Sequence, residues 1–396
     1  MYNKNIMKLP SSKRTQTTQL HIDPGVIDLG VGQPQLSLLP IDLMRQAAED
    51  RFASGESDFL QYGAEQGDGL FRCELARFLT HGYGFEVNPD DLFITNGASL
   101  SLDLICTLYS KPGDIVFIEE PSYFLALRTL ENHGLKPVPI PQDIDGLSIE
   151  ALERALQIQR PAFLYTIPTF QNPSGASLSL SKRLRLAEIS QQYDLLVVAD
   201  EVYHLLDYHA QDIQPLAKFS PQANIISLGS FSKILAPGLR LGWIQTSQSR
   251  AVHFSRAGLL SSGGGLNPFT SAIVRGILEN GGLETNITKL KNIYRQRIVA
   301  MTEALSTHIP QAQFQVPLGG YFFWVRLPDV YDTQAHLPTA ERYKVCYRPG
   351  AYFSVCGGQK DFVRLSFAYY PTDTLVEGVF RLGKSLSHRT TADLAA

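Results

Sequence analysis

Short apolar runs alternate with amphipathic stretches between about residues 45 and 245, and this alternation constrains the fold more than any other feature. The runs are rich in Ile, Val and Phe, and they cover residues 114–119, 162–167, 195–199 and 224–228. The stretch 180–193 between two of them has the apolar spacing of a helix. Buried strands that alternate with helices predict an α/β fold, with a mostly parallel sheet in a three-layer domain.

The C-terminal third has a different pattern. Gly263-Gly264-Gly265 precedes a long helical pattern that runs through Arg295 and Arg297, and strand-like segments follow at 321–326 and 362–367. A chain of 396 residues also exceeds the usual size of a single core. We therefore expect a large domain and a smaller α+β domain that the C-terminal part builds with the N-terminal segment. The expected divisions are 1–45 (arm and part of the small domain), 46–284 (large domain) and 285–396 (small domain).

Composition excludes several classes of protein. Hydrophobic residues make up 44% and charged residues 18%, as in a globular enzyme, and the formal net charge of −3 argues against nucleic-acid binding. No apolar run is long enough to cross a bilayer, and no secretory signal is present. The four cysteines are scattered, which fits reduced thiols. We expect a cytoplasmic enzyme with no membrane partner, although the basic first residues leave open an organelle transit sequence beside a frayed arm.

Polar residues follow three of the predicted strands, at the sheet edge where open α/β sheets bind ligands. Asn172 follows 162–167, Asp200 follows 195–199, and Lys233 follows 224–228. A partly desolvated lysine has a lowered pKa and can attack a carbonyl to form an imine, whereas a lysine at a helix start reaches into solvent. A carboxylate at the end of an apolar strand needs a positive partner, unless Asp200 caps the next helix.

Two segments have the residue types of a phosphate site. Ser230, Ser232, Lys233 and Arg240 lie within eleven residues, and hydroxyls with a guanidinium suit phosphate oxygens. The segment 96–99 contains small residues before a helix-like stretch at 100–109, and helix N-termini bind phosphate through free N–H groups.

Three rival motifs are weaker. Ser230-x-x-Lys233 matches the SxxK of serine acyl-hydrolases, but no KTG element accompanies it. Gly30-x-Gly32 lacks the third glycine of a dinucleotide fingerprint. His204 and His209 are five residues apart and do not share a helical face, so we predict no metal site.

The chain resembles the class I/II pyridoxal-phosphate-dependent aminotransferases (fold-type I, the aspartate aminotransferase superfamily) from about residue 27 to 370. Its most specific segment is SLGSFSKILAPGLRLGW at 227–243, and the family's order is kept by Asn172, Asp200, Tyr203, Lys233, Arg240 and Arg364. Within the family it looks most like the branch of 2-aminoadipate and broad-specificity aminotransferases. The resemblance implies pyridoxal 5'-phosphate as cofactor.

The resemblance also implies roles around the cofactor ring. Lys233 would hold the cofactor as a Schiff base and then act as the proton shuttle. Asp200 would pair with the protonated pyridine nitrogen and keep the ring an electron sink. Tyr203 and Asn172 would hydrogen-bond the ring's phenolic oxygen, and Tyr123 would stack on the ring, although an aromatic residue there could equally belong to the core.

Further roles concern the phosphate and the substrate. The phosphate would be held by Ser230, Ser232, Arg240 and the turn Gly97-Ala98-Ser99, which lacks the Gln that often follows this Ser in the family. Tyr62 resembles the tyrosine that reaches the phosphate from a neighbouring subunit, which implies a homodimer with shared active sites. Arg364 would clamp the α-carboxylate of the substrate, and Gly32 and Asn172 would line its pocket.

These roles predict a transaminase that moves an amino group between an L-amino acid and a 2-oxo acid by a ping-pong mechanism, in amino acid metabolism. A β-eliminating lyase on the same fold is the alternative. An aminotransferase-like domain of a transcription regulator would need an N-terminal helix-turn-helix, for which the residues before the family match leave no room. We expect 16–20 and 259–267 to line the side-chain pocket, and Leu38, Leu39 and Leu260 to favour an apolar or aromatic side chain.

Overall fold

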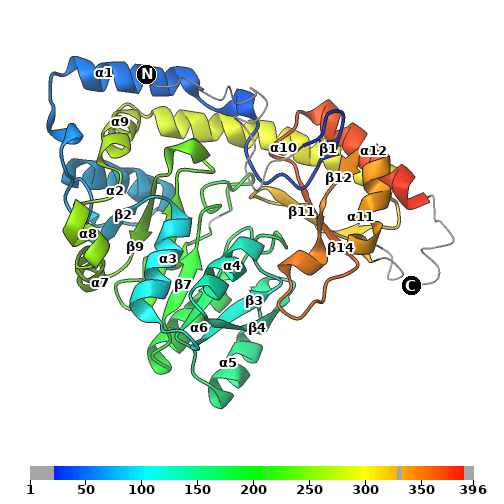
Figure 1. Ribbon diagram of the computed structural model, residues 1–396, viewed down its shortest axis with the longest axis horizontal. Coiled ribbons are helices and arrows are strands. Elements are labelled where there is room, and N and C mark those ends of the chain that lie inside the picture. The colour runs from blue at the N-terminus through cyan, green and yellow to red at the C-terminus, as the bar shows by residue number, and fades with distance from the viewer. Residues whose placement is uncertain (1–21, 212, 328–331, 388–396) are drawn as a thin grey trace, which may run out of the picture.

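The computed structural model describes residues 22–211, 213–327 and 332–387. Its largest element is an eight-stranded sheet whose strand order differs from the order along the chain (Figure 1). In spatial order the strands are β2 (Leu92–Thr95), β9 (Gly242–Gln245), β8 (Ile225–Ser230), β7 (Val197–Asp200), β6 (Phe163–Thr166), β3 (Ile115–Glu120), β4 (Lys136–Asp143) and β5 (Gly146–Leu147). The five strands from β8 to β4 are parallel, and β2, β9 and β5 are antiparallel to their neighbours.

Both faces of this sheet are covered. Along β6, Phe163 and Tyr165 belong to one hydrophobic cluster and Leu164 to a second, because successive strand residues point to opposite faces. The second cluster includes Leu152 and Leu186 on two helices in the lower part of Figure 1, α5 and α6. The arrangement confirms the predicted α/β fold with a mostly parallel, doubly covered sheet.

The helices lie around this sheet and a smaller one. Those of the first 263 residues are α1 (Ile41–Ala53), α2 (Gly69–Tyr83), α3 (Ala98–Tyr109), α4 (Phe124–Asn132), α5 (Ile149–Ile158), α6 (Leu180–Gln192), α7 (Gln248–Ser255) and α8 (Gly258–Gly263). They are followed by α9 (Pro268–Glu279), α10 (Gly282–His308), α11 (Thr333–Arg342) and α12 (Thr372–Ser387). Among the described residues, none of these helices combines the length and the apolar character that a membrane crossing requires.

The smaller sheet consists of β10 (Gln313–Phe314), β11 (Phe322–Arg326), β14 (Phe362–Ser366) and β13 (Arg348–Pro349), all antiparallel. A separate parallel pair joins β1 (Ile27–Asp28) to β12 (Val345–Cys346), so the N-terminal segment packs against the C-terminal part of the chain. Helix α10 extends from the large sheet to this region, where it packs on α12 (Figure 1). The domain limits at 45/46 and 284/285 stay a prediction.

The predicted long helical pattern is present as two helices, α9 and α10, which are separated at Asn280 and Gly281. Gly281 has φ +72°, a left-handed conformation that favours glycine and ends the regular helix.

Candidate active site

Two adjoining cavities lie at the carboxyl ends of the parallel strands. The first, of about 510 Å³, is bordered by Asp200 at the end of β7, and we call it the Asp200 cavity. The second, of about 500 Å³, is bordered by Arg364 of β14, and we call it the Arg364 cavity. Six residues line both cavities and therefore lie between them: Gly32, Tyr123, Leu125, Asn172, Tyr203 and Lys233.

The cavities bring together most of the predicted site residues. Asp200, Ala98, Ser99, Ser230, Ser232 and Arg240 line the Asp200 cavity, and Arg364 lines the Arg364 cavity. Gly97 directly precedes the lining residue Ala98. Tyr62 lines neither cavity, and 81% of its surface is exposed.

Lys233 lies three residues beyond the end of β8, between the two cavities. Its Nζ donates to the Gly32 carbonyl oxygen at 3.1 Å and lies 5.2 Å from the centre of the Tyr321 ring. Desolvation, followed by the positive charge of Arg364, lowers the pKa of Lys233 to about 8. The side chain is thus a buried-site amine and not a solvated lysine at a helix start.

Asp200 ends the apolar strand β7 and is only 8% exposed. Its Oδ2 accepts a hydrogen bond from the Tyr165 hydroxyl at 2.7 Å, and its Oδ1 has no partner among the described residues. Desolvation raises the pKa of Asp200, whereas the Tyr165 hydrogen bond, the backbone N–H of Val202 and the charge of Lys233 lower it. A buried carboxylate oxygen without a side-chain partner, in a residue that lines a cavity, is a place for a cationic group of a ligand.

The other end of the Asp200 cavity suits an anion. Helix α3 begins at Ala98 after Gly97, which has φ +88°, and the first N–H groups of a helix are free to bind a ligand. A Cβ on Gly97 would lie 3.1 Å from Arg240 Nη2, so the glycine leaves room for the guanidinium beside the helix start. Ser230 Oγ accepts from the Ser232 N–H at 3.1 Å, which turns the loop after β8 toward this end.

Arg364 is 3% exposed and stacks on aromatic rings in the Arg364 cavity, with the centre of the Phe322 ring 4.0 Å from its Cζ and that of Phe353 4.9 Å away. Its Nη1 donates to Asn172 Oδ1 at 2.9 Å and its Nη2 to the Gly30 carbonyl oxygen at 2.8 Å. Burial lowers its pKa to about 10. Its Nε is buried without a partner among the described residues, so this end of the cavity is prepared for a carboxylate.

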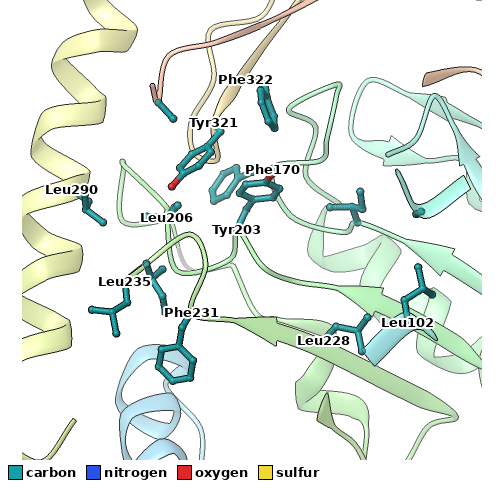
Figure 2. Packing of buried hydrophobic residues seen from close by; sticks show 14 of the residues in the cluster. Leu102, Phe170, Tyr203, Leu206, Leu228, Phe231, Leu235, Leu290, Tyr321 and Phe322 are labelled. Atoms are coloured by element: carbon teal, nitrogen blue, oxygen red, sulfur yellow. The ribbon is translucent and has the colours of Figure 1, made fainter. Parts of the chain in front are cut away.

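Tyr321 and Phe322, at the start of β11 in the smaller sheet, lie next to residues of the large sheet's loops, including the loop that carries Lys233. Figure 2 shows Tyr321 and Phe322 next to Phe170 and Tyr203, which come from the large sheet's loops. The Tyr321 hydroxyl donates to the Lys233 carbonyl oxygen at 3.0 Å. Sequence reasoning placed no site residue at 321 or 322, because a strand-like apolar segment there reads as core.

The leucines that we expected to favour an apolar or aromatic substrate side chain do not line the two cavities. Leu38 and Leu260 are buried in the hydrophobic core, and neither they nor Leu39 line the two cavities. No residue of 259–267 lines them either. The segment 16–20 lies outside the described residues. The aromatic and apolar walls of the Arg364 cavity come instead from Phe124, Leu125, Leu127, Phe322, Leu337, Tyr347 and Tyr352.

A family model, "Aminotransferase class I and II", matches residues 24–382. The chain belongs to the class I and II aminotransferases. It is 32% identical to the aromatic-amino-acid aminotransferase 1 of Thermococcus litoralis, over 97% of this chain and 94% of that protein. Both the predicted family and the predicted cofactor of this aminotransferase are thereby confirmed.

Solved structures agree. A kynurenine aminotransferase of Pyrococcus horikoshii in complex with PMP superposes with a TM-score of 0.86 at 33% identity, covering 92% of this chain and 91% of that one. The α-aminoadipate aminotransferase of Thermus thermophilus, complexed with N-(5'-phosphopyridoxyl)-L-leucine, gives a TM-score of 0.84 at 29% identity, covering 94% of each chain. The protein is a pyridoxal-phosphate-dependent transaminase, and the lyase alternative is not favoured.

The residues of this chain fit the cofactor. The unpartnered Asp200 Oδ1 suits the pyridinium N–H, and Arg240 with the start of α3 suits the phosphate. Lys233 lines both cavities, so its amine would be the group that holds the cofactor.

Proposed function

We propose that the enzyme exchanges an amino group between an L-amino acid and a 2-oxo acid in two half-reactions at the joined cavities. The observation that carries this proposal is the order of three groups across them. The partnerless oxygen of Asp200 lies on one side, the Lys233 amine in the middle, and the buried guanidinium of Arg364 on the other side. When bound, pyridoxal phosphate supplies an electron sink conjugated to the substrate's α-carbon.

Arg364 positions the substrate. Its Nη atoms already donate to Asn172 and Gly30, and its unpartnered Nε adds a buried donor for the α-carboxylate. The rings of Phe322 and Phe353 restrict its orientation. A carboxylate held there has its α-carbon toward Lys233, so orientation reduces the entropy cost of the reaction.

Lys233 moves the proton. With a pKa of about 8, its Nζ is neutral in an appreciable fraction of molecules near pH 7 and can take the proton from the substrate's α-carbon. It then delivers this proton on the other side of the transferred nitrogen. One water molecule supplies the keto oxygen of the departing 2-oxo acid, and the amino group stays with the enzyme. A second 2-oxo acid takes the group by the same steps in reverse.

The remaining predicted residues hold the cofactor in place. Gly97, Ala98, Ser99, Ser230, Ser232 and Arg240 would bind the phosphate, Tyr123 would stack on the ring, and Tyr203 with Asn172 would donate to its phenolic oxygen. Desolvation raises the pKa of Tyr203, so its hydroxyl stays protonated and can donate. Asp200 would remain ionised against the ring nitrogen.

The exposure of Tyr62 supports a homodimer in which each subunit completes the other's phosphate site. Leu60, two residues before it, and the mutually packed Phe52 and Phe269 are also exposed in the single chain, which fits a surface that a second copy covers. We propose a cytoplasmic location for this dimer.

Borohydride reduction of the holoenzyme tests the proposed attachment. The reduction fixes the cofactor covalently to the lysine that holds it, and peptide mass spectrometry then locates the added mass. We expect it on the peptide with Lys233 in the wild type, and on no lysine in Lys233→Ala. Attachment to another lysine in the wild type would overturn the assignment.

A further inference from the structure

Tyr165 lies where it can act on the cofactor without touching a reacting atom. Tyr165 of β6 pairs with Val198 of the neighbouring strand β7. Asp200 is two residues further along β7, so the side chains of Tyr165 and Asp200 point to the same face of the sheet. The Tyr165 hydroxyl reaches Asp200 Oδ2 at 2.7 Å, and the ring, 1% exposed, forms part of the wall of the Asp200 cavity.

The hydrogen bond has a fixed direction. Desolvation, with the nearby Asp200, raises the pKa of Tyr165 well above its usual value, so the hydroxyl stays protonated and donates to the ionised carboxylate. One oxygen of Asp200 is thereby engaged by the protein, while Oδ1 is buried without a hydrogen-bond partner among the described residues, in a residue that lines the cavity. A carboxylate held by one oxygen has its rotation about χ2 restricted, and its second oxygen keeps one direction.

We infer that Tyr165 is a positioning residue that aims Asp200 Oδ1 at the ring nitrogen of the cofactor and keeps this carboxylate ionised in its buried place. The inference rests on the proposed pairing of Asp200 with that nitrogen.

Neighbouring residues hold Tyr165 itself. Thr166, the next residue of β6, donates to Glu119 Oε1 at 2.9 Å, and the Ile167 N–H donates to Glu119 Oε2 at 2.9 Å. Glu119 is fully buried at the end of β3, so the strand end that carries Tyr165 is anchored on its opposite face. The position of the tyrosine ring is therefore set by the sheet and does not depend on a ligand.

The test compares two ligands of the apoprotein: pyridoxal phosphate and its 1-deaza analogue, in which C–H replaces the ring nitrogen. Dissociation constants are measured by fluorescence for the wild type, Tyr165→Phe, Asp200→Asn and the double variant. The dissociation constant of the analogue divided by that of pyridoxal phosphate reports the contribution of the contact with the ring nitrogen alone. A hydrogen bond to a charged group has a net value that corresponds to roughly ten-fold or more in binding, so we expect Tyr165→Phe to reduce the ratio by about that factor.

The double variant and a control separate this role from simple packing. In Asp200→Asn the preference for the nitrogen is already lost, so adding Tyr165→Phe should leave the ratio unchanged. Tyr208→Phe removes another buried tyrosine hydroxyl, which donates to the Gly320 carbonyl oxygen outside both cavities, and should leave the wild-type ratio.

Each outcome decides something. If Tyr165→Phe weakens both ligands equally, or neither, Tyr165 is only a structural residue and the inference is wrong. If the wild-type apoprotein does not prefer pyridoxal phosphate over the deaza analogue, the pairing by Asp200 fails, and the proposed function fails with it.

Discussion

The lowered pKa of Lys233 gives the most specific prediction about chemistry. With a pKa of about 8 instead of the usual 10.5, about one amine in eleven is neutral at pH 7, against about one in three thousand for an ordinary lysine. The neutral amine is the nucleophile, so Lys233 of the apoprotein should react faster at pH 7 than an unperturbed lysine of equal access, by up to roughly 300-fold. This factor follows from the desolvation of the Lys233 side chain, which is the largest cause of its lowered pKa.

Trace acetylation of the apoprotein over a series of pH values measures this directly. Mass spectrometry of the Lys233 peptide gives its rate of labelling, and the exposed Lys218 serves as internal reference for the reagent. We expect the Lys233 rate to rise with pH and to level off above a midpoint of about 8.

Charge variants test the direction in which neighbouring charges shift the pKa of Lys233. Arg364→Met removes a like charge and should move the Lys233 midpoint upward, whereas Asp200→Asn removes the opposite charge and should move it downward. Because desolvation is the largest cause, both variants should keep the midpoint below the usual 10.5. A wild-type midpoint above 10, or shifts of the same sign in both variants, would refute the reasoning.

Three further predictions follow from other contacts. Arg364→Lys should lower kcat/KM for the amino acid by about 10²-fold, mainly through KM, because a lysine cannot replace the bidentate donors; steady-state kinetics with an unchanged KM would contradict this. Glu201→Gln should lower the free energy of unfolding by about 3–5 kcal/mol, since it leaves the buried Arg183 guanidinium, 3.8 Å from Glu201 Oε1, without its charge partner. Urea denaturation measures this, and a loss under about 1 kcal/mol would count against it. Mixing unfolded Tyr62→Ala and Lys233→Ala chains and refolding them together should restore activity that neither variant has alone, because one site of the hybrid dimer is then intact. No restoration on refolding would place Tyr62 outside the partner's site.

The sequence predicted four strands of the large sheet, β3, β6, β7 and β8, within two residues. Long apolar runs of Ile, Val and Phe leave few alternatives, and the polar residue that ends each run, such as Asp200, marks the sheet edge at which ligands bind. The site residues that follow the family's order also come together in the structure, with Asn172 and Arg364 in direct contact over 192 positions of sequence.

Other features could not be predicted from local pattern. Tyr165 reads as one more apolar residue of a buried strand, and its contact with Asp200 depends on the register of β6 and β7. The ion pair of Arg348 with Asp28, 3.1 Å between Nη2 and Oδ2, joins the two ends of the chain beside the Arg364 cavity. Register and long-range pairing are set by tertiary packing, which a single sequence does not display.

The most direct test of transamination at Lys233 is a pair of half-reactions followed by visible absorbance. The holoenzyme is mixed first with an L-amino acid and then, after removal of the product, with a 2-oxo acid. We predict that the yellow absorbance is lost on the first addition, with one 2-oxo acid formed per site, and returns on the second, and that Lys233→Ala does neither. Release of ammonia with no loss of the absorbance, or full turnover by Lys233→Ala, would contradict the account.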